Sequence, residues 1–160
     1  MRIVIDTNVF ISGLVFDGIP EKVIKSALSK DNKLIISAYI INETSRNLKN
    51  KFGLQPESLQ LYQATMSVSQ VIYFDPFLQV LSDKPDNRVL ETALKGKADF
   101  IVTGDKKLLG LKRYKNIRII KPAEFLNLIA GWTATWSSRS SKNDSSNCRW
   151  VSPQELNNEQ

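Results

Sequence analysis

Residues 2–8 read Arg-Ile-Val-Ile-Asp-Thr-Asn, a β-branched run that ends at an acidic side chain. Consecutive apolar residues of this kind are typical of a parallel strand that is buried on both faces. We therefore predict a central strand over residues 2–5, with Asp6 at its carboxyl end. Ligand sites of open parallel sheets form outside the carboxyl ends of the strands, so Asp6 is a candidate site residue.

Further apolar runs alternate with helical patterns along the chain. Strands are predicted at residues 34–36, 71–74, 100–102 and 117–120. Helices are predicted at residues 20–28, from the N-cap Ser37 to about 52, from 56 to 66, after Asp86 to 96, and from 122 to 131, with a turn at 7–13 and a short helical turn at 106–109. This alternation predicts an α/β domain of three layers, α/β/α, with a central parallel sheet of about five strands.

The composition changes after Gly131, which divides the chain into a domain at 1–131 and a tail at 132–160. The tail holds seven Ser and four Asn with little apolar periodicity, which predicts disorder. All three Trp residues also lie in the tail, and the sequence assigns them no role.

The absence of histidine and the single cysteine exclude several chemistries. A histidine-based catalytic triad, a mixed Cys/His zinc site and an intramolecular disulfide all need residues that this chain lacks. No apolar stretch approaches the roughly 20 residues that span a bilayer, and Asp6 interrupts the N-terminal run before a signal peptide can form. These features predict a protein of the reducing cytoplasm that does not bind a membrane.

The net charge of +6 is concentrated in one segment. Residues 1–94 balance ten basic against ten acidic side chains, whereas residues 95–121 hold nine basic side chains and two acidic ones. Such a cluster is the usual footprint of a polyanion partner, although a solvated lysine-rich surface explains it equally well.

Four acidic residues fall where a sheet-edge site would form. Asp6 follows the first strand, Glu43 lies about two turns into the helix after the second, Asp86 begins the helix before the fourth, and Asp105 follows the fourth. Each has a structural alternative, since Asp is a preferred N-cap and Glu43 is compatible with an ordinary solvent-facing position. Clustered carboxylates repel one another unless a cation neutralises them, and ligation by oxygen alone suits Mg²⁺ or Mn²⁺.

The acidic residues lie in recognisable motifs. Residues 2–10, the segment Ser37-Ala-Tyr-Ile-Ile-Asn-Glu43, the segment Pro85-Asp86-Asn-Arg-Val-Leu-Glu91, and residues 98–109 with Ile-Val-Thr-Gly-Asp105 resemble the four acidic motifs of the PIN domain. More narrowly, the chain resembles the PIN-family (VapC-like) toxins of prokaryotic toxin-antitoxin systems. The resemblance covers residues 1 to about 130.

The resemblance implies an endoribonuclease that uses one or two Mg²⁺ or Mn²⁺ ions. By motif, Asp6, Glu43, Asp86 and Asp105 match the metal-binding acids, and Asn8 and Thr103 match polar positions beside them. It also implies a cognate antitoxin protein as partner and a possible homodimer. RNA contacts are expected from the basic segment, at Lys106, Lys107, Lys112, Arg113 and Lys115. Asp99 begins its strand and is placed outside the site.

Other interpretations are weaker. A phosphatase of the HAD type needs a second Asp where this chain has Asn8, and a phosphoacceptor receiver domain needs paired acids where Asp6 stands alone. A non-catalytic PIN domain that binds RNA or a protein without cleavage remains the main alternative.

Overall fold

A mostly parallel sheet forms the centre of the protein, here described from a computed structural model in which residues 1–139 are placed, with side chains described to residue 131. The sheet has six strands in the order β3-β2-β1-β4-β6-β5. The strands are β1 Arg2–Ile5, β2 Lys33–Ser37, β3 Gln70–Ile72, β4 Phe100–Val102, β5 Arg113–Tyr114 and β6 Ile117–Ile120. All neighbouring pairs are parallel except β5 and β6, which form an antiparallel pair at one edge. The prediction of an α/β fold with a parallel sheet is confirmed, and the two-residue β5 is the strand that the sequence did not predict.

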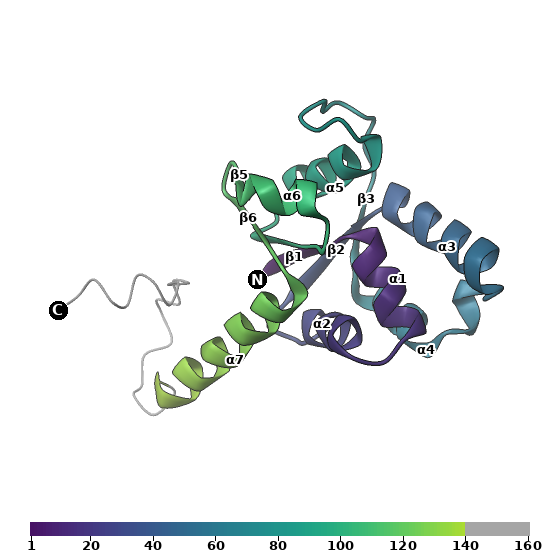
Figure 1. Ribbon diagram of the computed structural model, residues 1–160. Helices are drawn as coiled ribbons and strands as arrows, with labels where there is room; N and C mark the ends of the chain where they lie inside the picture. The colour runs from purple at the N-terminus through teal and green to yellow at the C-terminus, as the bar shows by residue number, and fades with distance from the viewer. Residues whose placement is uncertain (140–160) are drawn as a thin grey trace.

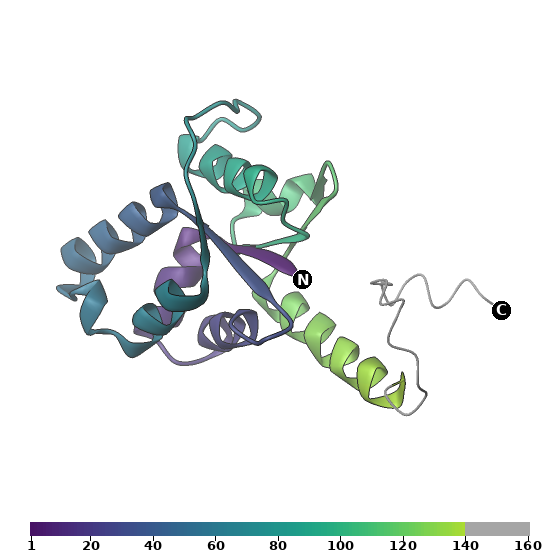
Figure 2. The same ribbon diagram turned by 180° about the vertical axis from the view of Figure 1, so that it is seen from behind.

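Helices cover both faces of this sheet. They are α1 Thr7–Val15, α2 Ile19–Ala27, α3 Ala38–Phe52, the 3₁₀ turn η1 Pro56–Ser58, α4 Gln60–Val68, α5 Lys84–Lys95, α6 Lys106–Leu111 and α7 Pro122–Arg139. In Figures 1 and 2, α5 lies on one side of β1 and β2, and α1 and α2 lie on the other. The central strands are therefore enclosed between helices, and Val4 and Ile101 are fully buried. This enclosure explains why β1 and β4 are apolar without alternation.

Several helix boundaries follow the local signals that the sequence provides. The Ser37 hydroxyl accepts a hydrogen bond from the Ile40 amide at 3.3 Å and caps α3, and Gly53 ends that helix with φ of 63°. Proline at the N-terminal turn of α2 and of α5 has a φ angle suited to a helix start and lacks an amide that would go unbonded there.

Four helical predictions need correction. Residues 7–15 form α1 rather than a turn; this helix packs against α2 and α3 and is largely buried, so its sequence shows little amphipathic period. A 3₁₀ turn precedes α4, so that helix starts at Gln60, and α5 starts at Lys84 rather than after Asp86. The last helix, α7, extends to Arg139 and not only to Gly131, since no proline interrupts residues 132–139.

The division into a domain and a disordered tail stays a prediction. Residues 140–160 and the side chains of Trp132, Trp136 and Trp150 lie outside the described part of the protein. Among the described residues, no helix is both long and apolar enough to cross a membrane.

Candidate active site

The candidate site lies where the strand order changes direction. Strands β2 and β3 extend the sheet to one side of β1, while β4 and β6 extend it to the other. Ile5 pairs with Val102, and the Asp6 amide donates to the Val102 carbonyl oxygen at 2.9 Å, so Asp6 and Thr103 leave the sheet side by side. Crevices of open α/β sheets form at such a switch point.

Thr103 joins two of the candidate acids. Its hydroxyl donates to Asp6 Oδ2 at 2.7 Å and accepts from the Asp105 amide at 3.0 Å. Thr103 is fully buried and Asp6 is only 6% exposed. Thr103 therefore lies beside Asp6 and Asp105, while its role in a site stays a prediction.

Asp86 approaches Asp6 and Asp105 from helix α5. It lies in the first turn of α5 and is 9% exposed, and its buried Oδ2 has no hydrogen-bond partner among the described residues. Burial first, and then the charges of Asp105, Asp6 and Asp83, raise the pKa of Asp86 from 3.8 to about 6, while Lys107 acts in the opposite direction. A helix N-cap role for Asp86 is excluded, since Asp83 occupies that position.

The charge on Asp6 is disfavoured for similar reasons. Burial raises the pKa of Asp6 above its ordinary value, and Asp105 adds to that rise; the Thr103 hydroxyl and the amides of Thr7 and Asn8 act in the opposite direction. The charges of Asp6, Asp86 and Asp105 therefore act on one another. A proton or a cation is needed to relieve their repulsion.

Asp105 combines a structural position with a place in this group. It is the N-cap of α6, and its Oδ1 accepts from the amides of Lys107 at 2.8 Å and Leu108 at 3.2 Å. Both hydrogen bonds use the same oxygen, so the cap leaves Oδ2 for another interaction. The cap interpretation is correct for Asp105 and does not remove it from the site.

Glu43 is not engaged with the three aspartates. Its carboxylate forms an ion pair with Arg46 at 2.8 Å and accepts from Asn47 at 3.0 Å, all within α3. Its charge still acts on Tyr39: burial raises the pKa of the Tyr39 phenol, Glu43 and Asp86 raise it further, and Arg46 and Arg88 lower it. Tyr39 thus lies within electrostatic reach of both Glu43 and Asp86.

The remaining predicted residues surround the aspartates. Asn8 is exposed in the first turn of α1, beside Asp6. Lys106, Lys112, Arg113 and Lys115 are exposed on α6 and on the β5–β6 hairpin. Lys107 is also exposed, but it forms an ion pair with Asp83 that joins the starts of α6 and α5. Asp99, placed outside the site, accepts from the Arg2 amide at the other end of the strands.

The donor set fits a hard divalent cation. Among the described residues, no three acidic or cysteine side chains converge closely enough to enclose a metal ion in the present arrangement. Mg²⁺ does not need such a cage, because it usually keeps several waters and binds through one or two carboxylates and a substrate phosphate. The partnerless oxygen of Asp86, beside the repelling carboxylates of Asp6 and Asp105, matches this requirement.

Comparison with known proteins identifies the family. The family model described as PIN domain matches residues 2–107, which span β1 to the start of α6 and include all four candidate acids. The chain belongs to the PIN-domain family. It is also 32% identical over 140 residues to an uncharacterized protein of Methanocaldococcus jannaschii, with 79% of this chain and 90% of that protein covered.

Membership of the PIN-domain family indicates which kind of reaction the chain is suited to. PIN domains form a superfamily of nucleases that act in general on RNA. The matched range contains Asp6, Asn8, Glu43, Asp86, Thr103 and Asp105, as well as Lys106 and Lys107. Lys112, Arg113 and Lys115 lie beyond the matched range, at the end of α6 and on the β5–β6 hairpin.

Sequence reasoning missed several residues around this PIN-domain site. Asp83 raises the pKa of Asp86 and forms an ion pair with Lys107. The sequence signal for it was Pro85, because proline is common in the first turn of a helix and Asp83 is the N-cap just before that turn. Glu91 is fully buried and holds the segment before α5 through the amides of Phe77 and Leu78, each 2.6 Å from its Oε1. No local pattern distinguishes such a buried acid from a surface one.

Changing Thr103 to Val should remove its hydrogen bond to Asp6 and lower the stability of the protein without altering the shape of the site. Hydrogen bonds to charged groups contribute about 1.5–3 kcal/mol, so we expect Thr103→Val to lower the free energy of unfolding by about that amount at pH 7–8. The pKa of Asp6, which is already raised, should rise further. Urea unfolding measures the first effect. Thr103→Ser keeps the hydroxyl and should retain most of the stability; equal losses in both variants would refute the role of this hydrogen bond.

Proposed function

We propose that this PIN domain is a metal-dependent endoribonuclease, in which Asp6, Asp86 and Asp105 bind one or two Mg²⁺ or Mn²⁺ ions. The observation that carries the proposal is the buried, partnerless Oδ2 of Asp86, whose pKa is raised beside Asp105 and Asp6. A carboxylate kept in this state at neutral pH lacks a counter-charge, and a divalent cation would supply it.

The chain's own residues have distinct tasks in this scheme. Thr103 fixes the orientation of Asp6, and the α6 amides fix Asp105, so two carboxylates are held before substrate arrives. Glu43 would join them only by exchanging its contact with Arg46 for the cation. A bound divalent ion would activate water and neutralise charge on the phosphate, giving a 5′-phosphate and a 3′-hydroxyl.

The exposed basic side chains would hold the RNA backbone. Lys106, Lys112, Arg113 and Lys115 are free of the Asp83 ion pair that engages Lys107. Since each lysine or arginine near a phosphate releases counterions, RNA affinity should fall steeply with salt.

A toxin role is the narrower form of this proposal. The motif resemblance to toxin components supports it and would require an antitoxin that covers the acidic crevice. A short gene directly upstream, encoding a protein that binds this chain and blocks cleavage, would support the role. An isolated gene would favour a different task in RNA processing.

Incubation of the purified full chain with a mixed RNA pool tests the activity itself. We expect cleavage with Mn²⁺, none with EDTA, and product 5′ ends that are substrates for a 5′-phosphate-dependent exonuclease. Binding of the pool without cleavage under both conditions would contradict the nuclease and favour a non-catalytic PIN domain. The ion pair that Glu43 forms with Arg46, which keeps it away from the aspartates, would then support the non-catalytic interpretation.

A further inference from the structure

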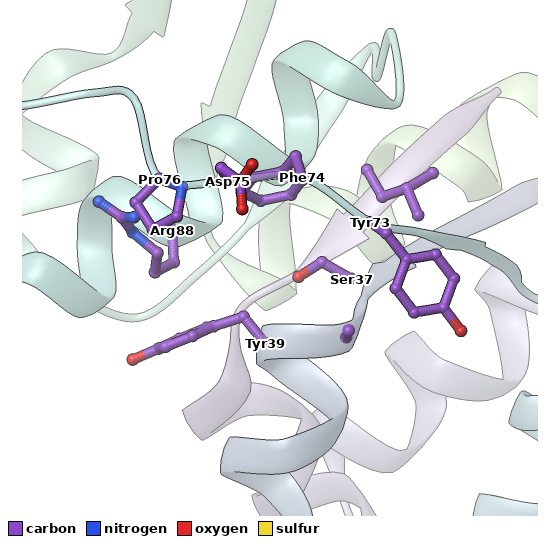
Figure 3. A pocket seen from close by; sticks show the side chains of 9 residues that line it. Ser37, Tyr39, Tyr73, Phe74, Asp75, Pro76 and Arg88 are labelled. Carbon is purple, nitrogen blue, oxygen red and sulfur yellow. The ribbon is translucent and has the colours of Figure 1, made fainter.

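A pocket of about 590 Å³ lies at the same edge of the sheet as the acids but is not part of their cluster. Its lining includes Ser37 and Tyr39 from the β2–α3 junction, Tyr73, Phe74 and Asp75 from the segment after β3, and Arg88 from α5. Figure 3 shows Tyr39 and Tyr73 on either side of Ser37, with Phe74 and Asp75 above. Its volume is in the range of about 300–1,000 Å³ that holds small ligands.

The floor of the pocket is held rigidly. Ser37 is 1% exposed, accepts from the Ile40 amide, and shares a hydrogen bond with the Thr92 hydroxyl at 2.9 Å. These two hydrogen bonds hold the Ser37 hydroxyl in position.

The opposite wall is fixed by buried groups of α5. Arg88 Nε lies 3.0 Å from Glu91 Oε2, and Glu91 holds the amides of Phe77 and Leu78. Asn87 accepts from the amides of Val80 and Leu81 at 3.0 and 2.9 Å. The chain that follows the pocket wall is thus anchored on α5, whereas the wall itself, residues 73–76, has no regular structure.

The pocket adjoins the acidic site. Ser37 ends β2, and Asp6 follows β1, the next strand in the sheet. Tyr39 lines the pocket and also lies within electrostatic reach of Asp86 and Glu43. A nucleotide in the pocket would therefore be close to a phosphate held at the aspartates.

The chemistry of the lining matches a nucleobase. Single-stranded RNA is recognised by stacking of unpaired bases on aromatic or arginine planes and by hydrogen bonds to their edges. Tyr39, Tyr73 and Phe74 supply rings, Arg88 supplies donors, and the Asp75 carboxylate supplies an acceptor. Tyr73 is 79% exposed, so its ring is available for stacking.

We propose that this pocket binds one unpaired base of the RNA substrate, next to the nucleotide whose phosphate is cleaved. The proposal rests on the proposed function for the identity of the ligand as RNA. It adds a positional requirement, since one base of the substrate, and not the backbone alone, contributes to binding.

Binding without divalent metal separates this proposal from the nuclease. Fluorescence anisotropy in EDTA would measure the affinity of the full chain for a labelled single-stranded hexanucleotide and for versions with one abasic site at each position. Stacking contributes about 1–3 kcal/mol per base, so one abasic position should weaken binding roughly 5- to 150-fold. In Tyr73→Ala, the intact hexanucleotide should bind more weakly, and the same abasic site should have little further effect.

Phe16→Ala is the matched control, because Phe16 is an exposed ring at the far end of α1. This variant should bind every hexanucleotide as the parent does. The pocket assignment would be overturned by equal affinity for all abasic versions, by unchanged RNA affinity of Tyr73→Ala, or by no RNA binding at all. A pocket that binds a protein segment would give the first two results. Base-dependent binding without cleavage in Mn²⁺ would keep the pocket and refute the nuclease. Cleavage in Mn²⁺ without base-dependent binding would support the nuclease and refute the pocket assignment.

Discussion

Asp86→Asn is expected to abolish RNA cleavage while leaving the fold intact. The substitution keeps the shape of the side chain but removes the negative charge that a hard cation needs. Loss of residues that merely orient metal ligands reduces activity about 10- to 100-fold, so loss of a ligand should reduce it by at least about 100-fold. Initial rates on a labelled RNA in Mn²⁺ measure this effect.

The same variant should be more stable than the parent at neutral pH without metal. Because the folded state raises the pKa of Asp86 from 3.8 to about 6, the folded protein binds more protons than the unfolded chain between these values. Stability from this group is therefore present below pH 4 and lost as pH rises through about 6. At 1.36 kcal/mol per unit, the loss is at most about 3 kcal/mol, and Asp86→Asn avoids it.

Asp99→Asn provides the matched control. Asp99 is an exposed acid at the other end of β4, where it accepts from the Arg2 amide, and an asparagine oxygen can replace it. We expect parental cleavage from this variant. Parental cleavage from Asp86→Asn as well would remove Asp86 from the site.

The second large effect is expected on stability, from Glu91→Ala. Glu91 is fully buried, faces Arg88 at 3.0 Å and accepts two amides from the segment before α5. Removing one partner of a buried pair leaves the other charge uncompensated, at a loss of about 3–5 kcal/mol. Urea unfolding should show this loss, and amide exchange at Phe77 and Leu78 should accelerate.

Glu57→Ala is the comparison for that measurement. Glu57 is exposed in the η1 turn, so its replacement should change stability by less than about 0.5 kcal/mol. If Glu91→Ala were equally mild, the buried pair would not hold the wall of the pocket.

Much of the fold follows from local pattern. The buried strands β1 and β4 are continuous apolar runs, and α3 has a serine at its start and a left-handed glycine at its end. The helix α1 was missed because a buried helix has no polar face to reveal its period. The strand β5 was missed because two residues are too few to show alternation, whereas β6 was predicted at the residues it occupies.

The site is predictable to the extent that backbone position determines it. Asp6 and Asp105 are brought together because parallel strands end at one edge, and that rule needs no side-chain knowledge. Contacts of long side chains follow different rules. Glu43 pairs with Arg46 and Lys107 with Asp83, and these choices depend on rotamers and charges that spacing along the chain does not specify.

The most direct test of the central claim is divalent-cation binding by the RNA-free protein. Titration of Mn²⁺ into the full chain, followed by calorimetry and by thermal unfolding, should show saturable binding and a rise in Tm for the parent and for Asp99→Asn. Asp86→Asn should show neither, since it retains the fold without the charge. Identical Mn²⁺ binding by all three proteins, or none by the parent at millimolar concentration, would contradict the assignment of these aspartates as a metal site.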